Sequence, residues 1–189
     1  MNISFGKKIP IMKCQVQNLK TKDFVPSTVY EYDCEDKHDA NNIDKIDGYW
    51  IFKPQIFFQA QDKHCFPQKY KNTKIYSLET NTGETLGMMV LDKAGNNNNV
   101  DVLETKFQSG HKYVGKSLLA AAAQETLKGS YKKLTITHPI PDVRDFYIDS
   151  CGFKETSGRP LEMNNEDLMS FIKTVEKSVH TNFIDLQGW

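Results

Sequence analysis

The stretch Gly110–Ser117 reads Gly-His-Lys-Tyr-Val-Gly-Lys-Ser and has the residue types of an anion-binding loop. It follows a predicted strand and leads into a predicted helix. Its backbone N–H groups therefore lie at a helix N-terminus, where a phosphate group is favoured. Gly115 lets phosphate approach the backbone because it carries no Cβ, and Lys112 and Lys116 can add charge-assisted contacts. The sequence thus predicts a phosphate-binding loop.

Two strands and one helix must hold this loop in place. Val100–Phe107 is predicted to be the strand before the loop, and Tyr131–Thr137 the strand after the helix. The helix begins near Gly115 and runs through Leu127, with Gly129 at its C-terminal cap. Four consecutive alanines give the helix a small apolar surface, which predicts close packing on a sheet.

The flanking segments continue this alternation of strands and helices. Lys74–Thr80 and Thr85–Asp92 predict a β-hairpin, because turn-forming residues separate them. The stretch 94–99 contains four consecutive asparagines and is expected to be a solvated loop. Three further elements are expected downstream: a short helix over Asp142–Cys151, a strand from Gly152-Phe153 and a helix over Asn165–His180.

The first seventy residues give a weaker signal. Short strands are predicted at Ile9–Val16 and Thr28–Tyr32, and Glu35–Asp47 is expected to be a loop or one short helix. Gly48–Gln59 is rich in aromatic and β-branched residues, but Pro54 would interrupt a central strand there. The order of the elements predicts an α+β or mixed α/β fold.

Composition narrows the class of protein. A chain of 189 residues with 39% hydrophobic residues is long enough for one domain with a sizeable core. Lys+Arg 24 and Asp+Glu 24 balance, which gives no reason to expect nucleic acid or a membrane surface as a partner. Without a membrane-spanning run or a secretory signal, a cytoplasmic location is expected. The four cysteines lie far apart without a CxxC pair, so reduced thiols and no metal site are expected.

Two classes of protein have a loop of this kind. Read literally, Gly110–Ser117 matches GxxxxGK[ST], the P-loop of nucleotide hydrolases. However, the residues Lys106–Ser109 before the loop are polar, and the apolar run that ends at Asp92 precedes the loop instead of following it. The residues after Ser117 are also too few for a multi-strand parallel sheet. The nucleotide-binding interpretation is therefore the weaker one.

More of the chain resembles the GNAT superfamily of N-acetyltransferases. In that family a strand, a loop of type Q/R-x-x-G-x-G/A and a helix bind acetyl-coenzyme A (acetyl-CoA). The resemblance covers about residues 74–156. Arg144–Phe153 resembles the family's second helix and its Gly-Phe turn, often of the form A-x-x-F-Y-x-x-x-G-F.

The loop itself departs from the family's pattern. Aligned without gaps, Gly110 stands where Arg or Gln is common, Tyr113 where the first glycine is common, and Gly115 at the second glycine. A shift by two positions gives Lys112-x-x-Gly115-x-Ser117, which keeps a basic residue and one glycine.

The resemblance implies one GNAT-like domain over 1–189, with a divergent N-terminal part (1–73), an acetyl-CoA-binding core (74–156) and a C-terminal strand and helix (157–189). It implies a central mixed, mostly antiparallel sheet flanked by helices, in which two neighbouring parallel strands splay and accept the pantetheine arm. The implied cofactor-binding residues are Leu103, Glu104, Thr105, Gly110, His111, Lys112, Tyr113, Val114, Gly115, Lys116 and Ser117.

The implied activity is transfer of an acetyl group from acetyl-CoA to a primary amine of a small molecule or protein. Tyr147 is the candidate acid that protonates the departing thiolate. A gap-free comparison anchored on Gly152 nevertheless places Ile148 at the family's tyrosine position. Because one position turns a helical side chain by about 100°, a packing role for Tyr147 is an equal alternative.

Several residues are candidates for the base that accepts a proton from the amine. Glu104 and Asp101 are candidates on the strand before the loop, and because they lie three residues apart they are expected on opposite faces. His111 and His138 are further candidates. Two alternatives to an active transferase stay open: a catalytically degenerate GNAT-fold protein that binds a partner or cofactor, and a nucleotide-binding protein that uses Gly110–Ser117.

Overall fold

The computed structural model describes residues 8–129, 131–157 and 160–183. Four α-helices, a 3₁₀ turn (Pro141–Val143) and a π turn (Phe146–Ser150) are interleaved with strands. The helices are α1 (Lys37–Asn42), α2 (Lys53–Cys65), α3 (Val114–Lys128) and α4 (Asn165–Val179). The strands are β1 (Ile9–Asn18), β2 (Phe24–Glu31), β3 (Lys74–Thr80), β4 (Thr85–Ala94), β5 (Asn97–Thr105), β6 (His111–Lys112), β7 (Lys133–Ile136), β8 (Lys154–Glu155), β9 (Leu161–Asn164) and β10 (Asn182–Phe183).

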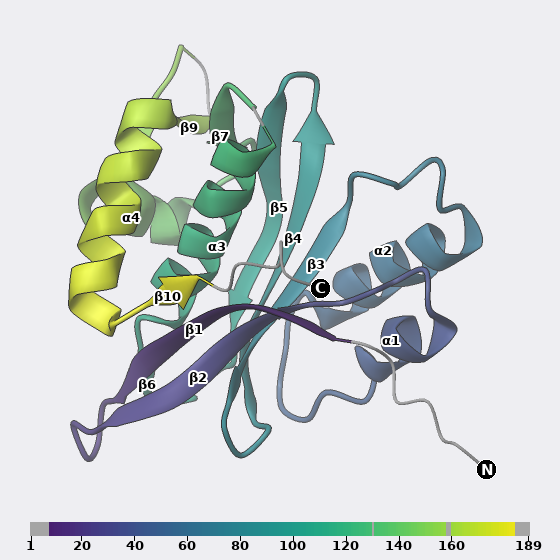
Figure 1. Ribbon diagram of the computed structural model, residues 1–189, viewed down its shortest axis with the longest axis horizontal. Coiled ribbons are helices and arrows are strands. Elements are labelled where there is room, and N and C mark those ends of the chain that lie inside the picture. The colour runs from purple at the N-terminus through teal and green to yellow at the C-terminus, as the bar shows by residue number, and fades with distance from the viewer. Residues whose placement is uncertain (1–7, 130, 158–159, 184–189) are drawn as a thin grey trace.

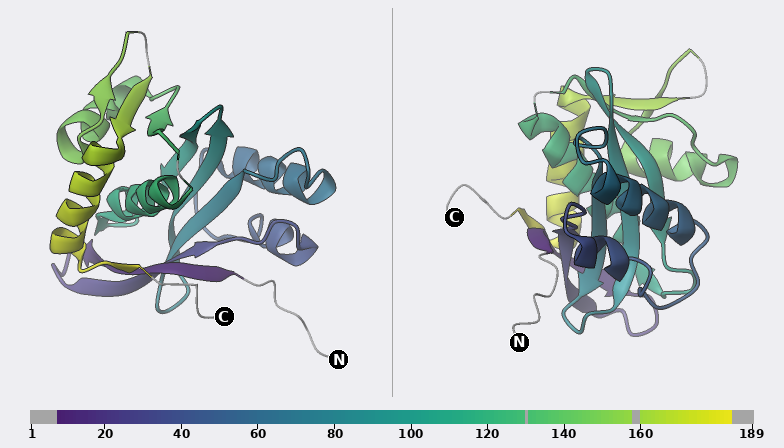
Figure 2. Two further views of the ribbon diagram at one scale, coloured as in Figure 1. Left: turned by 45° about the horizontal axis from the view of Figure 1, so that its top comes forward. Right: turned by 90° about the vertical axis from the view of Figure 1, so that its right-hand side faces the viewer.

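The strands form one curled sheet in the order β10-β1-β2-β3-β4-β5-β7-β9-β8, with β6 paired to β1 (Figures 1 and 2). The pair β5/β7 is parallel, and every other strand pair in the described part of the chain is antiparallel. The predicted mixed, mostly antiparallel sheet flanked by helices is therefore confirmed. This arrangement is not the multi-strand parallel sheet that the nucleotide-hydrolase interpretation requires.

The helices cover the two faces of the sheet separately. α3 and α4 lie on one face, and α1 and α2 lie on the other (Figure 1). The stretch Leu118–Ala123 of α3 is buried throughout, because its small side chains pack between the sheet and α4. On the opposite face, Ile56 and Ala60 of α2 join a second apolar core with Val90 and Val102 of the sheet.

Most of the predicted elements are present with shifted ends. The hairpin β3–β4, the helix α3 with Gly129 at its cap, and the helix α4 agree with expectation. At the start of α4, the Asn164 side chain accepts from the backbone N–H groups of Glu166 and Asp167, which caps the helix. The expected helix Asp142–Cys151 is instead a 3₁₀ turn followed by the π turn.

Two segments differ from expectation. In the first seventy residues, α1 agrees with the loop or short helix expected over Glu35–Asp47, whereas the sequence does not predict α2. Pro54 lies in the first turn of α2, where its missing N–H costs no hydrogen bond. The expectation of a solvated loop over 94–99 is wrong, because Asn97 begins β5 and both Asn98 and Asn99 are buried. Hydrogen bonds to neighbouring threonines compensate for burying these two amides.

Candidate functional site

The parallel strands β5 and β7 pair over a very short distance. Asn98 pairs with Leu134 and Asn99 with Thr135, and no pairing between the two strands follows in the described residues. Just beyond this point β5 contains a β-bulge, because Leu91 faces Val100 whereas Val90 faces Val102. The bulge bends β5, and a cavity of about 270 Å³ lies where the two strands separate.

The cavity has walls from both faces of the sheet. Val100–Leu103 of β5 form one wall, and Ile136, His138 and Tyr147 form the other. Phe52, which precedes α2, and Gln55 of α2 contribute from the opposite face. The predicted separation of these two strands is therefore present in the structure. The contribution of α2 to the cavity wall is not predicted by the sequence analysis. Pro54 at the helix start is the signal that could have revealed α2.

The predicted phosphate-binding loop lies at the C-terminal end of β5 and leads into α3. Gly110 and Tyr113 both have left-handed backbone conformations, with φ of 66° and 75°. The first intrahelical bond runs from the Ser117 N–H to the Tyr113 carbonyl at 2.9 Å. The N–H groups of Val114, Gly115 and Lys116 therefore precede the helical ladder and are the donors available to an anion. Ser117 is not one of these donors, because its N–H makes the intrahelical bond and its side chain is fully buried.

The remaining loop residues have defined positions. His111 and Lys112 pair with Asn18 and Gln17 of β1, which fixes the loop to the sheet edge. Tyr113 stands where the family has glycine and keeps the left-handed conformation, at a cost of about 1–2 kcal/mol for a non-glycine residue. Its ring packs against the core, and the Lys112 ammonium lies 5.0 Å from the ring centroid.

Gly115 lies close to the π turn that contains Phe146. A Cβ built on Gly115 would lie 3.4 Å from Cζ of Phe146 and 3.9 Å from Cγ2 of Thr105. Alanine is therefore tolerated at this position, whereas any large side chain would displace the Phe146 ring. The contact brings the loop, the end of β5 and the π turn together at one point.

Tyr147 lines the cavity because of the π turn. The π turn contains one extra residue relative to an α-helical turn. Tyr147 lies five positions before Gly152, and its side chain therefore takes the direction that an α-helix would give to the residue four positions before Gly152. Tyr147 thus lines the cavity and Ile148 does not, and the acid role of Tyr147 stays a prediction. Burial, and secondarily Cys151, raises the pKa of the Tyr147 hydroxyl to about 12, so it stays protonated at neutral pH.

The two candidate bases lie on the same face of β5. The bulge at Asp101 shifts the alternation by one residue, which corrects the expectation that Asp101 and Glu104 face opposite sides. The Asp101 carboxylate accepts from Gln59 Nε2 at 2.6 Å and from Gln55 Nε2 at 3.4 Å. Asp101 is exposed and lines the cavity on the side of α2.

Glu104 makes different contacts. One of its carboxylate oxygens accepts from the Ile51 N–H, and the other accepts from the Phe52 N–H at 2.9 Å. These two amides lead into α2, so the carboxylate caps the helix and complements its dipole. The base role of Glu104 stays a prediction, and we infer from these contacts that the residue positions α2 beside the cavity.

Replacing Glu104 by alanine should lower the free energy of unfolding by about 1–2 kcal/mol, the range for losing a helix cap. Urea denaturation measures the change, and Glu104→Gln, which keeps one acceptor oxygen, should lose less. Asp101→Ala is the matched control, because its carboxylate bonds two side-chain amides and not the backbone N–H groups at the start of α2. Unchanged stability in Glu104→Ala would contradict the capping role.

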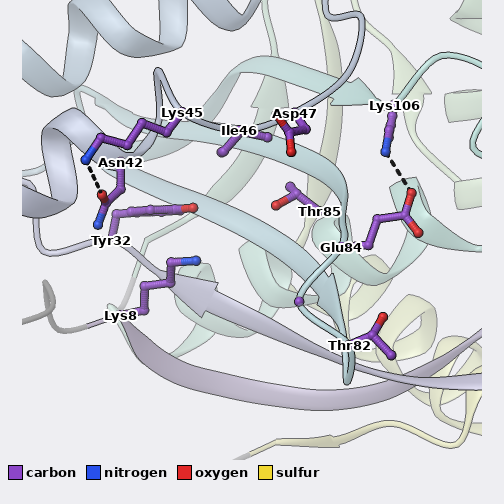
Figure 3. A pocket seen from close by; sticks show the side chains of 11 residues that line it. Lys8, Tyr32, Asn42, Lys45, Ile46, Asp47, Thr82, Glu84, Thr85 and Lys106 are labelled. Carbon is purple, nitrogen blue, oxygen red and sulfur yellow. Dashed lines mark hydrogen bonds and ion pairs between the residues drawn. The ribbon is translucent and has the colours of Figure 1, made fainter.

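A larger hollow of about 490 Å³ lies elsewhere, beside the β3–β4 turn and the loop after α1 (Figure 3). Its three lysines, Lys8, Lys45 and Lys106, each have a polar partner. Lys106 pairs with Glu84 at 2.7 Å, and Lys8 pairs with the nearly buried Glu79 at 2.7 Å. Tyr147 and the α3 N-terminus do not line it. The smaller cavity, where chemically useful groups converge, is the candidate site.

Comparison with known proteins identifies the fold. No protein-family model and no curated protein matches the sequence. Solved structures do match. A GNAT-family acetyltransferase from Desulfovibrio desulfuricans superposes with a TM-score of 0.56 at 9% identity, covering 74% of this chain and 99% of that chain. A structure of AtaTR bound with acetyl-CoA gives 0.54 at 17% identity, covering 76% and 96%.

A third structure, a GNAT-family acetyltransferase from Staphylococcus aureus Mu50, gives a TM-score of 0.51 at 12% identity, covering 74% of this chain and 99% of that chain. The chain therefore has the fold of GNAT acetyltransferases, which confirms at the level of the fold the resemblance seen in the sequence. Among the helices in the described residues, none has the length and apolar character needed to cross a membrane.

Proposed function

We propose that the protein is an acetyl-CoA-dependent N-acetyltransferase that acts on a primary amine. One observation carries the proposal: β5 separates from β7 at a cavity that a protonated tyrosine lines, and the N-terminus of α3 lies against Phe146, the residue next to that tyrosine. An unpaired strand edge suits an amide-containing arm, and helix N–H donors suit a pyrophosphate. Acetyl-CoA has both an amide-containing arm and a pyrophosphate. The AtaTR structure with the same fold was solved with acetyl-CoA bound.

Each part of the site has a distinct task in this proposal. The N–H groups of Val114, Gly115 and Lys116 bind the pyrophosphate. The unpaired part of β5, Val100–Leu103, donates and accepts hydrogen bonds along the pantetheine arm. The arm then runs from α3 toward the point where β5 meets β7, so the acyl group lies deepest in the cavity.

Acetyl-CoA supplies an activated acyl group in a thioester. The incoming amine forms the new C–N bond with the acyl carbon, and the C–S bond breaks. Tyr147 gives its proton to the departing thiolate and regains one from solvent. Asp101, on the α2 side, holds the amine as a cation during entry and accepts a proton from it. His138 is a further acceptor within the cavity wall.

The first test is binding followed by turnover. Titration calorimetry with acetyl-CoA should give saturable binding to one site, and a thiol-detecting assay should then show coenzyme A release that depends on an added primary amine. Binding without thiol release across a panel of small and peptide amines would favour the degenerate GNAT-fold alternative. Magnesium-dependent ATP hydrolysis without acetyl-CoA binding would favour the nucleotide-binding alternative.

A further inference from the structure

One side chain ties β5 to β7 at the point where they separate. Oδ1 of Asn99 accepts from Thr137 Oγ1 at 2.6 Å, from the Thr137 backbone N–H at 3.2 Å and from Thr135 Oγ1 at 3.1 Å. Since the Thr137 N–H can only donate, the oxygen of the Asn99 amide must face it. Asn99 is 8% exposed, so these bonds form in a largely dry environment.

The bonds between Asn99 and Thr137 lie at the point where the far wall of the cavity begins. Thr137 is the first residue after β7, and His138 and Ile140, which follow it, line the cavity. Backbone pairing between the two strands ends at Asn99 and Thr135. The Asn99 side chain therefore extends the connection by two residues beyond the last paired position and fixes where the far wall of the cavity begins.

The neighbouring residue Asn98 serves as an internal comparison. It is also buried, at 4% exposure, but its side chain lies on the face that α3 covers, since successive side chains of a strand alternate between the two faces. Its Nδ2 donates to Thr126 Oγ1 of α3 at 3.2 Å and makes no side-chain bond to β7 within the described chain. Adjacent asparagines of similar burial thus connect β5 to different elements, and only Asn99 bears on the cavity.

We propose that Asn99 is a positioning residue that holds the far wall of the cavity, residues 137–140, against β5 and thereby limits the transferred acyl group to a short one. The proposal rests on the proposed function, in which the acyl group lies nearest the point where β5 meets β7. The Asn99–Thr137 bonds hold the segment 137–140 against β5. Without them, it can move and make room for additional methylene groups.

Amide hydrogen exchange tests the connection without reference to activity. In Asn99→Ala the Thr137 N–H should exchange at least about fivefold faster, which corresponds to the loss of one net hydrogen bond of about 1 kcal/mol. In Asn98→Ala the same N–H should exchange at the wild-type rate, apart from any change in global stability. Equal acceleration in both variants would overturn the connection.

Acyl selectivity tests the consequence. The ratio of kcat/KM for acetyl-CoA to that for butyryl-CoA should fall by about tenfold in Asn99→Ala, the scale at which a pocket discriminates one or two methylenes. Thr137→Val, which removes only the hydroxyl donor, should shift the ratio in the same direction. Thr137→Ser, which keeps the hydroxyl, should have the wild-type ratio. Asn98→Ala should lower stability without changing the ratio.

The outcomes separate the two proposals. An unchanged ratio in Asn99→Ala and Thr137→Val, with acetyl transfer intact in the wild type, overturns the role of Asn99 and leaves the proposed function standing. Absence of acyl-CoA binding in the wild type overturns the proposed function and the acyl limit together, and the exchange measurement still decides whether Asn99 holds Thr137. If Asn99→Ala fails to fold, Thr137→Val and Thr137→Ser still carry the selectivity test, because they change the hydroxyl that bonds Asn99.

Discussion

Replacing Tyr147 by phenylalanine should lower turnover by about 10²–10⁴, the range for losing a general acid, while acetyl-CoA still binds. The ring packs against Phe146 and Phe153, and these contacts survive in phenylalanine. We therefore expect a melting temperature close to that of the wild type. The measurements are kcat from thiol release, Kd for acetyl-CoA from calorimetry, and thermal unfolding of both proteins.

Tyr76 offers a matched control for this experiment. Its hydroxyl is fully buried in β3, makes no hydrogen bond within the described part of the protein and does not line the cavity. Tyr76→Phe should leave turnover unchanged and should not reduce stability, because it removes an unpaired buried polar group. Full activity in Tyr147→Phe would assign Tyr147 to packing and leave the proton to water or another group.

Inverting the charge of Lys116 should weaken acetyl-CoA binding by about tenfold or more at low salt. Lys116→Glu places a carboxylate at the α3 N-terminus, where it repels a pyrophosphate that the same N–H groups attract. The helix itself should tolerate or even prefer the acidic residue, since glutamate in a first turn is stabilising by about 0.3–1 kcal/mol. Ligand affinity and protein stability should therefore change in opposite directions.

The salt dependence and a control on the same helix sharpen this test. The loss of affinity should shrink as ionic strength rises, because exposed charges are screened. Lys116→Ala should cost less than about tenfold, since backbone N–H groups make most of the phosphate contact. Lys128→Glu, at the exposed C-terminal turn of α3, should not affect affinity. Unaltered binding in Lys116→Glu would exclude this helix end as the pyrophosphate site.

Local patterns in the sequence are sufficient to predict the central elements of the fold. The turn residues between β3 and β4, the alanine-rich face of α3 and the capping residues of α4 are signals carried by neighbouring residues. The helix α2 was missed because aromatic residues obscured its period and Pro54 was read as a strand breaker. The asparagines of β5 were misread because their burial depends on threonines about 30 to 40 residues further along the chain.

The site was predicted in outline, and its details were hidden by two single-residue irregularities. The bulge at Asp101 places Asp101 and Glu104 on one face, and the π turn directs Tyr147 into the cavity. Neither follows from periodicity, because each breaks the period on which such reasoning depends. The cap formed by Glu104 was likewise invisible, since its partners Ile51 and Phe52 are more than fifty residues away in the chain.

The burial of α3 has a consequence for the order in which the chain can fold. The helix whose N-terminus is the proposed pyrophosphate site is covered by α4, and β10 pairs with β1 through Phe183 and Met12. A nascent chain without residues 165–183 would therefore expose the apolar flank of α3 and leave an edge of β1 unpaired. We expect a chain growing from the ribosome to gain its ligand-binding competence late in synthesis, when α4 can dock.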